Sequence, residues 1–503
     1  MRTADAIRST AAPPLATGAG PRRVTSYAGG SEQNDHVGPD TRFDMLVVGS
    51  GPAGEKAAAQ AAYFGRRVAV VDRSPVPGGA MVESAIATKA MREAALYLTG
   101  FTRHEVYGVG MDLDPQAVID RMRFRAADVG ATLSAAVEAN LRRHGIELVV
   151  GTARLGPGRS LVVAPPGSGA RVELGADAIL LATGSRPFHP PGVPFEDPDV
   201  LDSETARALD RPLRSLVVVG GGAVACEYAS IFLALGAEVT LVDRGPRLLP
   251  FLDAALSELL ADSFRSRGMR VLSETGVADV GRDDEGLRVV TSDGQEARPE
   301  KIVFAAGRVG NTEELGLAEA GVAVDERGRI LVDHQYRTNV PGIFAAGDVI
   351  GPPALASVSM EQGRVAACYA MGISFKQTVD SVTPFGVYSI PECAMVGLTE
   401  EEARTQGVDY EIGVAHFRDN SRAAIAGPAE GLLKLVARRG DHRLLGVHIV
   451  GEGATELIHQ GQSVLHFDGT IDYFIHSTFD VPTVSDSYKY AAYDCLQRLA
   501  RHA

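Results

Sequence analysis

The sequence predicts an α/β protein that contains two copies of one strand–turn–helix–strand unit and ends in a smaller α+β domain. Three observations lead to this prediction. The 503 residues are too many for one hydrophobic core, and 45% of them are apolar, so several packed domains are expected. A glycine-rich turn between a buried strand and an apolar helix occurs twice. After residue 382, short strand patterns alternate with turns and are followed by helices.

The first unit combines a strand at 45–48, a glycine-rich turn, an alanine-rich helix and a second strand. In the turn, Gly49 permits a tight bend, Gly51 lets the backbone approach a pyrophosphate, and Gly54 lets the helix pack on the strand. The N-terminus of the helix then faces the anion. The second strand ends on Asp72, whose carboxylate can accept hydrogen bonds from a ribose diol. The unit is therefore typical of a Rossmann-like dinucleotide site.

The second unit repeats the same order of elements in the middle of the chain. Its turn contains Gly220 and Gly222, and its second strand ends on Asp243. A second complete unit predicts a second dinucleotide. Asp243 favours NAD, because its charge opposes a 2′-phosphate, whereas Arg244 and Arg247 just beyond it could accommodate NADP. The sequence therefore leaves the choice between NAD and NADP open.

Three short motifs follow the first unit: Ala-Thr-Gly-Ser-Arg-Pro at 182–187, Ala-Ala-Gly-Arg at 305–308 and Ile-Phe-Ala-Ala-Gly-Asp at 343–348. Together with the two units, this ordered set resembles the pyridine nucleotide-disulfide oxidoreductase family over residues 43 to about 500. The resemblance implies that the first unit holds FAD, that the second holds NAD(P)H, and that Asp348 reaches the flavin ribityl chain. It also implies a homodimer that forms through the C-terminal domain.

The resemblance implies an α/β fold with two Rossmann-like domains, one for FAD and one for NAD(P), and a C-terminal α+β dimerisation domain. The first residues are rich in Pro, Gly, Ser and Thr without apolar periodicity, so we expect a disordered tail. Apolar spacing predicts a helix at about 115–144 and a strand at 146–153. The expected segments are the tail at 1–41, the first part of the FAD-binding domain at 42–188, the NAD(P)-binding domain at 189–310, the second part of the FAD-binding domain at 311–381 and the dimerisation domain at 382–503.

The residues that follow the first unit lack the chemistry of a disulfide reductase. Reductases of this family carry a cysteine pair there, before a helix with a lysine, whereas the stretch 78–90 contains Lys89 and no cysteine, and is one residue shorter. Without a dithiol, no thiolate relay to a disulfide substrate can form. Near the C-terminus, Val481 precedes Pro482 where the reductases place a base histidine, and valine cannot shuttle a proton. Disulfide reduction is therefore not expected.

Several local runs resemble instead the soluble, Si-specific transhydrogenase branch of the family, which also dispenses with the intact thiol pair. They are Gly54-Glu55 and the runs 226–232, 248–253, 361–364 and 456–462. We therefore hypothesise FAD-dependent hydride transfer between NAD(P)H and NAD(P)+, which needs no general acid because hydride carries both electrons. Lys89 and Glu227 match family positions beside the flavin N5 and the nicotinamide, and we expect them to tune the electrostatics of the reaction.

The candidate site combines two catalytic residues, Lys89 and Glu227, with a larger set of cofactor-binding residues, and we expect no metal in it. The cofactor-binding candidates are Gly49, Gly51, Gly54, Asp72, Gly79, Lys89, Thr183, Gly184, Gly220, Gly222, Asp243, Gly307, Gly347 and Asp348. The scattered cysteines suit neither a disulfide framework nor a zinc site, and we interpret them as buried residues in a reducing cytoplasm. They are Cys226, Cys368, Cys393 and Cys495.

Two other functions stay open from the sequence. An NAD(P)H:quinone or dye reductase would use the same reduced flavin. A non-catalytic, flavin-binding regulatory protein is the other alternative, although such a protein would not need the second dinucleotide unit that ends on Asp243. The formal net charge of −14, without a basic run, opposes binding to nucleic acid and to anionic membranes. The apolar stretch 216–242 contains Glu227 and three consecutive glycines, so it indicates a strand–turn–helix–strand rather than a membrane span.

Overall fold

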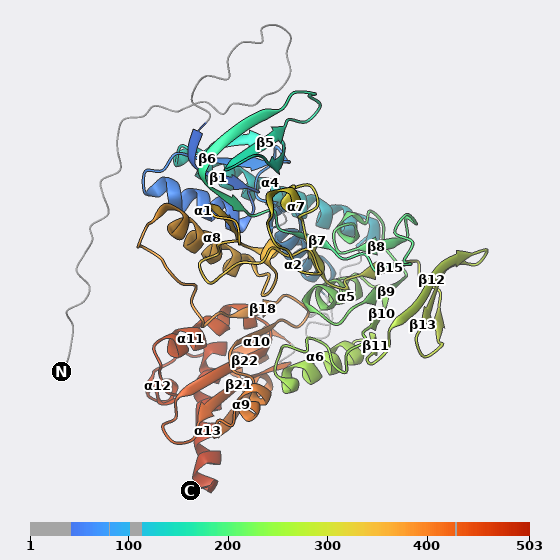
Figure 1. Cartoon of the computed structure of the whole chain (residues 1–503). Helices are drawn as coiled ribbons and strands as arrows, with labels where there is room; N and C mark the ends of the chain where they lie inside the picture. Colours follow the sequence, from blue (N-terminus) through green and yellow to red (C-terminus); the bar gives the residue numbers. More distant parts are fainter. Residues whose placement is uncertain (1–41, 80, 101–112, 428–429, 503) are drawn as a thin grey trace, which may run out of the picture.

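The computed structural model describes residues 42–79, 81–100, 113–427 and 430–502. The tail expected at 1–41 lies outside these residues. The described residues form five sheets: two large, mainly parallel sheets, a five-stranded antiparallel sheet in the C-terminal part of the chain, and two small antiparallel sheets of three and two strands. The C-terminal sheet lies at the lower end of the view in Figure 1.

The first sheet contains the first glycine-turn unit and strands that return to it later in the chain. Its strands are β1 (Arg42–Val48), β2 (Val68–Asp72), β3 (Glu147–Val150), β4 (Thr152–Leu155), β5 (Ser160–Ala164), β6 (Val172–Leu181) and β17 (Ile343–Ala345). Their order is β3-β2-β1-β6-β5-β4, and β17 also pairs with β6. All pairs are parallel except β4 with β5 and β5 with β6.

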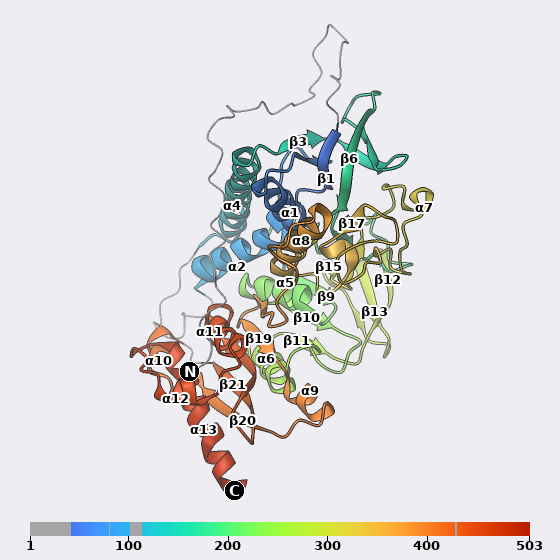
Figure 2. The same ribbon diagram turned by 60° about the vertical axis from the view of Figure 1, so that its left-hand side comes forward.

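Alternate residues of β1 enter two different cores, as the period of a strand requires. Met45 and Val47 pack against three helices on one face of the sheet, which Figure 2 shows side by side. Leu46 and Val48 pack on the other face with residues of β4, β5 and α7. The helices concerned are α1 (Pro52–Tyr63), α4 (Pro115–Arg143), α8 (Ala356–Met371) and the short α7 (Leu317–Ala320).

Two local features differ from the simplest interpretation of the sequence. The single strand expected at 146–153 is wrong, because β3 ends at Val150 and β4 begins at Thr152. The break has a physical reason: β3 pairs in parallel with β2, whereas β4 pairs antiparallel with β5, so the chain changes partner at Gly151. The lysine-containing helix α2 (Ile86–Thr99) follows one π-helical turn, Met81–Ala85, in the stretch that is one residue short.

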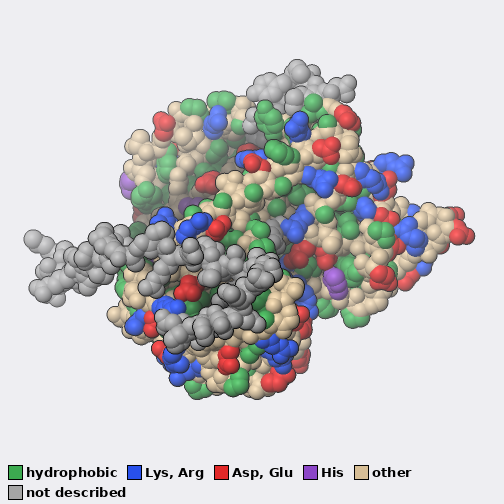
Figure 3. Space-filling view, turned by 90° about the horizontal axis from the view of Figure 1, so that it is seen from above, with side chains coloured by type: hydrophobic (Ala, Val, Ile, Leu, Met, Phe, Trp, Pro, Cys, Tyr) green, Lys and Arg blue, Asp and Glu red, His purple; other side chains and the backbone are tan. Residues whose placement is uncertain are grey.

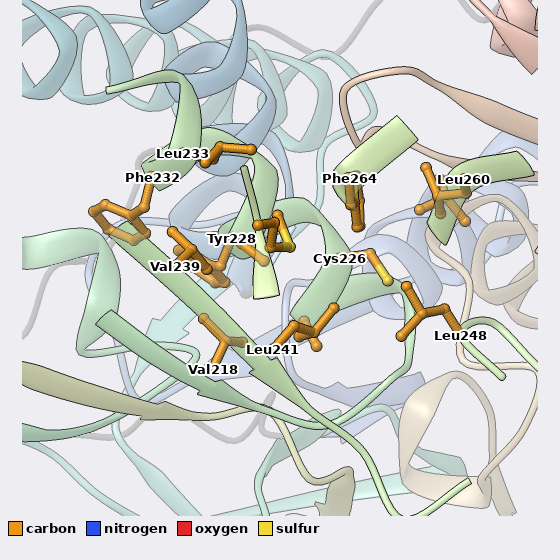
Figure 4. Packing of buried hydrophobic residues seen from close by; sticks show 14 of the residues in the cluster. Val218, Cys226, Tyr228, Phe232, Leu233, Val239, Leu241, Leu248, Leu260 and Phe264 are labelled. Atoms are coloured by element: carbon orange, nitrogen blue, oxygen red, sulfur yellow. The ribbon is translucent and has the colours of Figure 1, made fainter. Parts of the chain in front are cut away.

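The second glycine-turn unit forms a separate parallel sheet. Its strands are β8 (Val200–Asp202), β9 (Ser215–Val219), β10 (Glu238–Val242), β11 (Arg270–Leu272) and β15 (Lys301–Phe304), in the order β11-β10-β9-β15-β8. Helices α5 (Ala223–Ala234) and α6 (Ala254–Ser266) cover one face. Figure 4 shows Val218 and Leu241 of the strands against Tyr228, Phe232 and Phe264 of these helices. The other face is covered by β12 (Val277–Asp283), β13 (Gly286–Thr291) and β14 (Glu296–Ala297).

Two short antiparallel strands lie where the chain leaves the first sheet and where it returns to it. They are β7 (Ser185–Pro187) and β16 (Arg308–Gly310). Each follows a glycine with positive φ, 71° at Gly184 and 110° at Gly307. Because β7 and β16 pair with each other, the two chain segments that connect the parallel sheets are held together at one place.

The C-terminal sheet packs on the second parallel sheet through α6. Val387, Cys393, Leu432 and Val450 belong to the same core as Leu260 of α6. The other face of this sheet packs with its own helices. The strands are β18 (Phe385–Val387), β19 (Cys393–Gly397), β20 (Tyr410–His416), β21 (Gly431–Arg438) and β22 (Leu444–Gly451), and the helices are α9 (Glu400–Thr405), α10 (Ser421–Ala426), α11 (Ala454–His466), α12 (Asp472–His476) and α13 (Ser487–His502).

The surface carries charges of both signs. In Figure 3, Lys and Arg side chains alternate with Asp and Glu over the face shown, without a continuous basic area. Within the described ranges, no helix is both long and apolar enough to cross a membrane. The apolar stretch 216–242 is the unit β9, α5 and β10, as the sequence indicated.

Candidate active site

The three glycines of the first turn have different surroundings. Gly49 has a φ of 100°, and a Cβ on it would lie 2.4 Å from the carbonyl oxygen of Ala182. A Cβ on Gly54 would lie 1.9 Å from the carbonyl oxygen of Gly49, whereas a Cβ on Gly51 would meet no atom within 4 Å. The fold therefore requires the outer two glycines, and the middle one leaves the start of α1 open. A pyrophosphate fits there, because no side chain caps this helix.

Asp72 is held firmly at the end of β2. Its carboxylate accepts hydrogen bonds from the Ser50 amide at 2.7 Å, the Ser50 hydroxyl at 2.6 Å and the Ser74 amide at 2.9 Å. Ser50 Oγ also accepts from the Gly78 amide at 3.0 Å. Gly79 has a φ of 55°, and a Cβ on it would come within 3.3 Å of a Cα atom of the first turn. The loop at 78–79 thus closes over the turn beside Asp72, as a dinucleotide site requires.

Thr183 and Gly184 follow β6, and a residue that the sequence did not single out fixes both. Asn311 accepts from Thr183 Oγ1 through its carbonyl oxygen at 2.8 Å and donates its side-chain amide to the Thr183 carbonyl at 3.0 Å. Its backbone amide donates to the Gly184 carbonyl at 3.0 Å. Asn311 comes three residues after Arg308 of the second crossing strand, and only the tertiary fold brings it to Thr183.

Gly347 and Asp348 lie where α8 packs on α1. The Gly347 amide donates to Gln362 Oε1 at 2.9 Å, and a Cβ on Gly347 would lie 3.0 Å from the Cβ of Ala53 in α1. The Asp348 carboxylate accepts from Ser185 Oγ at 3.0 Å. The structure therefore brings Asp348 to the beginning of α1, although nearly 300 residues separate the two in the sequence.

The second turn repeats the geometry of the first. Gly220 has a φ of 122°, and a Cβ on it would lie 2.6 Å from the carbonyl oxygen of Ala305. A Cβ on Gly222 or on Gly307 would meet no atom within 4 Å. No side chain caps α5 at Gly222. The start of α5 is therefore open to an anion in the same way as the start of α1.

Asp243 turns back over the second turn. Its Oδ2 accepts a hydrogen bond from the Gly245 amide at 3.1 Å. A Cβ on Gly221 would lie 2.4 Å from the same oxygen. Gly221, the middle residue of the glycine run and absent from the predicted site residues, is therefore needed to make room for the acid. The run of three glycines was the available signal for it.

The two arginines after Asp243 have different roles in the fold. Arg247 donates to the carbonyl oxygens of Pro250 and Leu252 at 3.1 and 3.2 Å, and thereby holds the loop before α6. Arg244 lies along Gly276, where a Cβ would come within 2.9 Å of its Nε. In the part of the chain that the structure describes, the Arg244 guanidinium makes no hydrogen bond or ion pair. Arg244 is thus the arginine that is available to a phosphate.

Lys89 and Glu227 meet between the two glycine turns. Lys89 Nζ lies 2.7 Å from Glu227 Oε2, with side-chain exposures of 27% and 8%. The other oxygen, Oε1, accepts from the backbone amide of Tyr388 at 3.0 Å. Lys89 Nζ also lies 5.0 Å from the centre of the Tyr388 ring. The structure therefore joins the two predicted residues in a largely buried ion pair and adds Tyr388, to which the sequence gave no role.

The four cysteines are buried, as expected. Burial raises the pKa of Cys226 far above its usual value and raises the pKa of both Cys393 and Cys495 to about 12. None of these three thiols is therefore a thiolate at neutral pH. Val481, in the position of the reductases' base, has 63% of its surface exposed. Among the described residues, no group of three or more His, Cys, Asp or Glu side chains is arranged to hold a metal ion.

Two dinucleotide turns on separate parallel sheets, with one Lys–Glu pair between them, define a two-nucleotide oxidoreductase. A family model described as pyridine nucleotide-disulphide oxidoreductase matches residues 43–363, and the model of that family's dimerisation domain matches residues 383–492. The chain therefore belongs to the pyridine nucleotide-disulphide oxidoreductase family, and the predicted fold class is confirmed.

Similar proteins add detail to this assignment. The chain is 39% identical over 463 residues to the soluble pyridine nucleotide transhydrogenase of Mycobacterium bovis BCG, covering 91% of this chain and 98% of the relative. It is 37% identical over 468 residues to the transhydrogenase of the same name from Pseudomonas putida, covering 91% and 99%. Among solved structures, it resembles a copper complex of the HOCl-induced flavoprotein disulfide reductase RclA from Escherichia coli, with 25% identity, a TM-score of 0.81 and coverage of 90% and 99%.

Proposed function

We propose that this chain is an FAD-dependent enzyme that transfers hydride from NAD(P)H to NAD(P)+ without a redox dithiol. The observation that carries the proposal is the buried Lys89–Glu227 pair, which lies between two open dinucleotide turns and whose lysine follows a stretch, 78–88, without a cysteine. The transhydrogenase names of relatives that cover 91% of the chain support the same activity. Among the contacts of the described residues, none favours a quinone reductase or a non-catalytic role.

FAD fits the first turn, in residues 42–188 and 311–381. The amides at the start of α1 would receive the pyrophosphate, Asp72 the adenosine ribose, and Asp348 the ribityl chain. The open space at Gly51 and the firm position of Asp72 meet these needs. A bound FAD would supply the group that can take up hydride from one nicotinamide and give it to another. The family membership and the flavoprotein name of RclA support this cofactor.

The second turn, in residues 189–310, would bind the nicotinamide dinucleotides in succession. The start of α5 receives the pyrophosphate, and Gly222 leaves room for it. Asp243 offers its free carboxylate oxygen to the ribose diol, which favours NAD(H). Arg244 is the cation available to a 2′-phosphate, so NADP(H) is the weaker substrate rather than an excluded one.

Lys89 and Glu227 supply the electrostatics of the reaction. Glu227 accepts hydrogen bonds from Lys89 and from the Tyr388 amide, and it keeps the Lys89 ammonium at the junction between the two nucleotide sites. A fixed charge in a site shielded from water acts on hydride transfer more strongly than the same charge in solution. Hydride transfer between nicotinamides needs no proton donor from the chain. The proposed activity therefore does not require a histidine at the position of Val481.

We also propose that the enzyme is a homodimer in the cytoplasm. The match of residues 383–492 to the family's dimerisation domain supports the dimer. Large exposed side chains of that region, Tyr473, Val481 and Tyr490, would be covered in it. The relatives are named as soluble proteins, and buried free thiols suit a reducing compartment. Light scattering of the purified protein tests the dimer, and a single-chain mass would contradict it.

The decisive assay is anaerobic NADPH or NADH oxidation by FAD-loaded protein, with thio-NAD and a soluble quinone in separate cuvettes. We expect rapid formation of reduced thio-NAD and little reduction of quinone. Quinone reduction without any thio-NAD product would assign the chain to the quinone reductases. A protein whose flavin is not reduced by either nucleotide would instead be a flavin-binding protein without catalysis.

A further inference from the structure

A short extended segment of the C-terminal domain, residues 388–392, lies across the Lys89–Glu227 pair. We call it the strap. Successive backbone polar groups of the strap point alternately to two helices, as they do in an extended chain. The amides of Tyr388 and Ile390 face α5, where they donate to Glu227 Oε1 at 3.0 Å and to Ser230 Oγ at 3.1 Å.

The intervening residue faces the other helix. The carbonyl oxygen of Ser389 accepts a hydrogen bond from Arg92 Nε of α2 at 3.1 Å. Arg92 lies one turn after Lys89 on that helix, so both side chains are on the same side of it. The contacts form a closed ring that runs from α2 through Lys89, Glu227, the strap and Arg92 back to α2.

A buried ion pair fixes the end of the strap. Arg92 Nη2 lies 3.3 Å from Glu392 Oε1, and the two side chains are only 3% and 10% exposed. Glu392 Oε2 accepts from the amide and the hydroxyl of Thr455, at 3.1 and 2.9 Å, at the start of α11. Removing Arg92 would leave the Glu392 carboxylate buried without a close cation among the described residues, and removing Glu392 would leave the buried Arg92 guanidinium only the Glu93 carboxylate as an anionic partner. Arg92 also contacts Glu93, but that carboxylate is 71% exposed.

We propose that Arg92 and Glu392 are positioning residues, which hold Lys89 against Glu227 from the C-terminal domain by fixing the strap. Neither residue touches the nucleotide turns. The inference rests on the proposed function for the meaning of the Lys89–Glu227 pair. It adds that the third domain controls the geometry of the site within a single chain, in addition to any role in dimerisation.

The test is anaerobic stopped-flow reduction of the bound flavin by NADH, at several NADH concentrations, in full-length holoenzyme. We expect Arg92→Ala to lower the limiting rate about tenfold, because a misplacement of about 1 Å in a site can cost up to about 100-fold. The Kd for NADH should stay within about a factor of two, the scatter of independent sites. Arg92→Lys, which keeps the charge, should recover part of the rate.

A double-mutant cycle separates positioning from general destabilisation. In a Glu227→Gln background, Arg92→Ala should have little further effect on the limiting rate, because it acts through the pair that is already broken. The same tenfold loss in both backgrounds would overturn the inference, and so would an unchanged rate in Arg92→Ala. If Arg92→Ala does not fold, Glu392→Gln, which keeps the size of the side chain, replaces it in the cycle.

Glu411→Gln is the matched control. Glu411 is also a buried carboxylate of the C-terminal domain, with an arginine partner, Arg439, at 2.9 Å, but it belongs to β20, away from the strap. The limiting rate of this variant should equal that of the wild type. The reductive half-reaction does not need NAD+ as acceptor. A wild type that NADH reduces but that gives no reduced thio-NAD would therefore contradict the proposed function and leave the result for the strap intact.

Discussion

The two glycine turns share one geometry, but their acids are held differently. In the first unit, Asp72 accepts three hydrogen bonds, and the loop at 78–79 closes beside it. In the second, within the residues described, Asp243 accepts one hydrogen bond, from the Gly245 amide, although the loop after it also reaches the turn, where the Leu249 amide donates to the Gly221 carbonyl at 2.7 Å. An acid fixed by several hydrogen bonds suits a cofactor that stays, and an acid held by fewer suits substrates that must exchange. The difference supports the proposal of a resident cofactor at the first turn and exchanging nucleotides at the second.

The helices of the two units also lie at different distances from their strands. The third turn position is Gly54 in the first unit and Ala225 in the second. A Cβ at Gly54 would overlap the carbonyl oxygen of Gly49, whereas the Cβ of Ala225 is buried without a clash and would lie 3.7 Å from a Cβ on Gly220. The start of the first helix therefore lies too close to its turn for the methyl group that the second unit accommodates.

The largest effect that we predict tests this closer packing. Gly54→Ala should destabilise the protein by about 3 kcal/mol or more, because the new methyl group meets backbone that cannot rotate away. The variant should be purified largely without flavin. The measurements are the flavin-to-protein absorbance ratio and the free energy of unfolding in urea. Gly51→Ala is the control, since it should fold normally and lose only affinity for FAD, and equal stability of both variants would refute the argument.

The second prediction concerns the pair that lies between the turns. Glu227→Ala leaves the Lys89 ammonium without its carboxylate and the Tyr388 amide without its acceptor. Loss of such a fixed electrostatic group lowers a rate by about 100-fold. We therefore expect reduction of the flavin by NADH to slow by about that factor in stopped-flow experiments. Glu138→Ala on the surface of α4 should have no effect, and an unchanged rate in Glu227→Ala would remove Glu227 from the mechanism.

Much of this site could be predicted from the sequence, and the reason is local. Gly49 and Gly220 have φ values of 100° and 122°, where other residues are strained, so the pattern itself reports the turn. The different roles of Arg244 and Arg247 could not be predicted, because they depend on where the carbonyl oxygens of the following loop point. The role of Tyr388 could not be predicted either, because it binds Glu227 through its backbone amide, which every residue except proline carries.

Asp243, the acid that accepts fewer hydrogen bonds, should determine the preference between NADH and NADPH. Asp243→Asn should raise kcat/KM for NADPH relative to NADH about tenfold, which corresponds to about 1.4 kcal/mol, because it removes the repulsion of the 2′-phosphate. Arg244→Ala should lower the value for NADPH and leave that for NADH unchanged. Steady-state assays with both nucleotides measure the ratio.

Arg247→Ala provides the matched control for this pair. It should lower stability, because it frees two carbonyl oxygens of the loop before α6, without changing the preference between the nucleotides. If Arg247→Ala changed the NADPH-to-NADH ratio and Arg244→Ala did not, the roles that the structure gives to the two arginines would be reversed.

The two units also join the C-terminal domain in different ways. The first is joined through Arg92 and Glu392, and the second through the buried pair of Asp253 with Lys434, whose Nζ lies 2.9 Å from Oδ1. His448, fully buried, lies near that second junction. Its Nε2 is 2.9 Å from the Leu398 carbonyl, and its Nδ1 has no hydrogen-bond partner in the described structure. Burial lowers the pKa of His448 below its ordinary value of 6.5, although Asp253 opposes this shift.

The smallest effect is the pH dependence of this junction. Because the pKa of His448 is lower in the folded protein, the unfolded chain binds the proton first, and the neutral histidine stabilises the fold fully only above pH 6.5. Stability is then lost as the pH falls below 6.5 towards the folded pKa, with a slope of at most about 1.4 kcal/mol per pH unit for one proton. Replacing the ring in His448→Gln should flatten the dependence of the unfolding free energy on pH between 6.5 and 5, measured by urea denaturation. His476→Gln, at an exposed position, should leave the slope as it is. A slope that survives in His448→Gln would assign the acid sensitivity to another group.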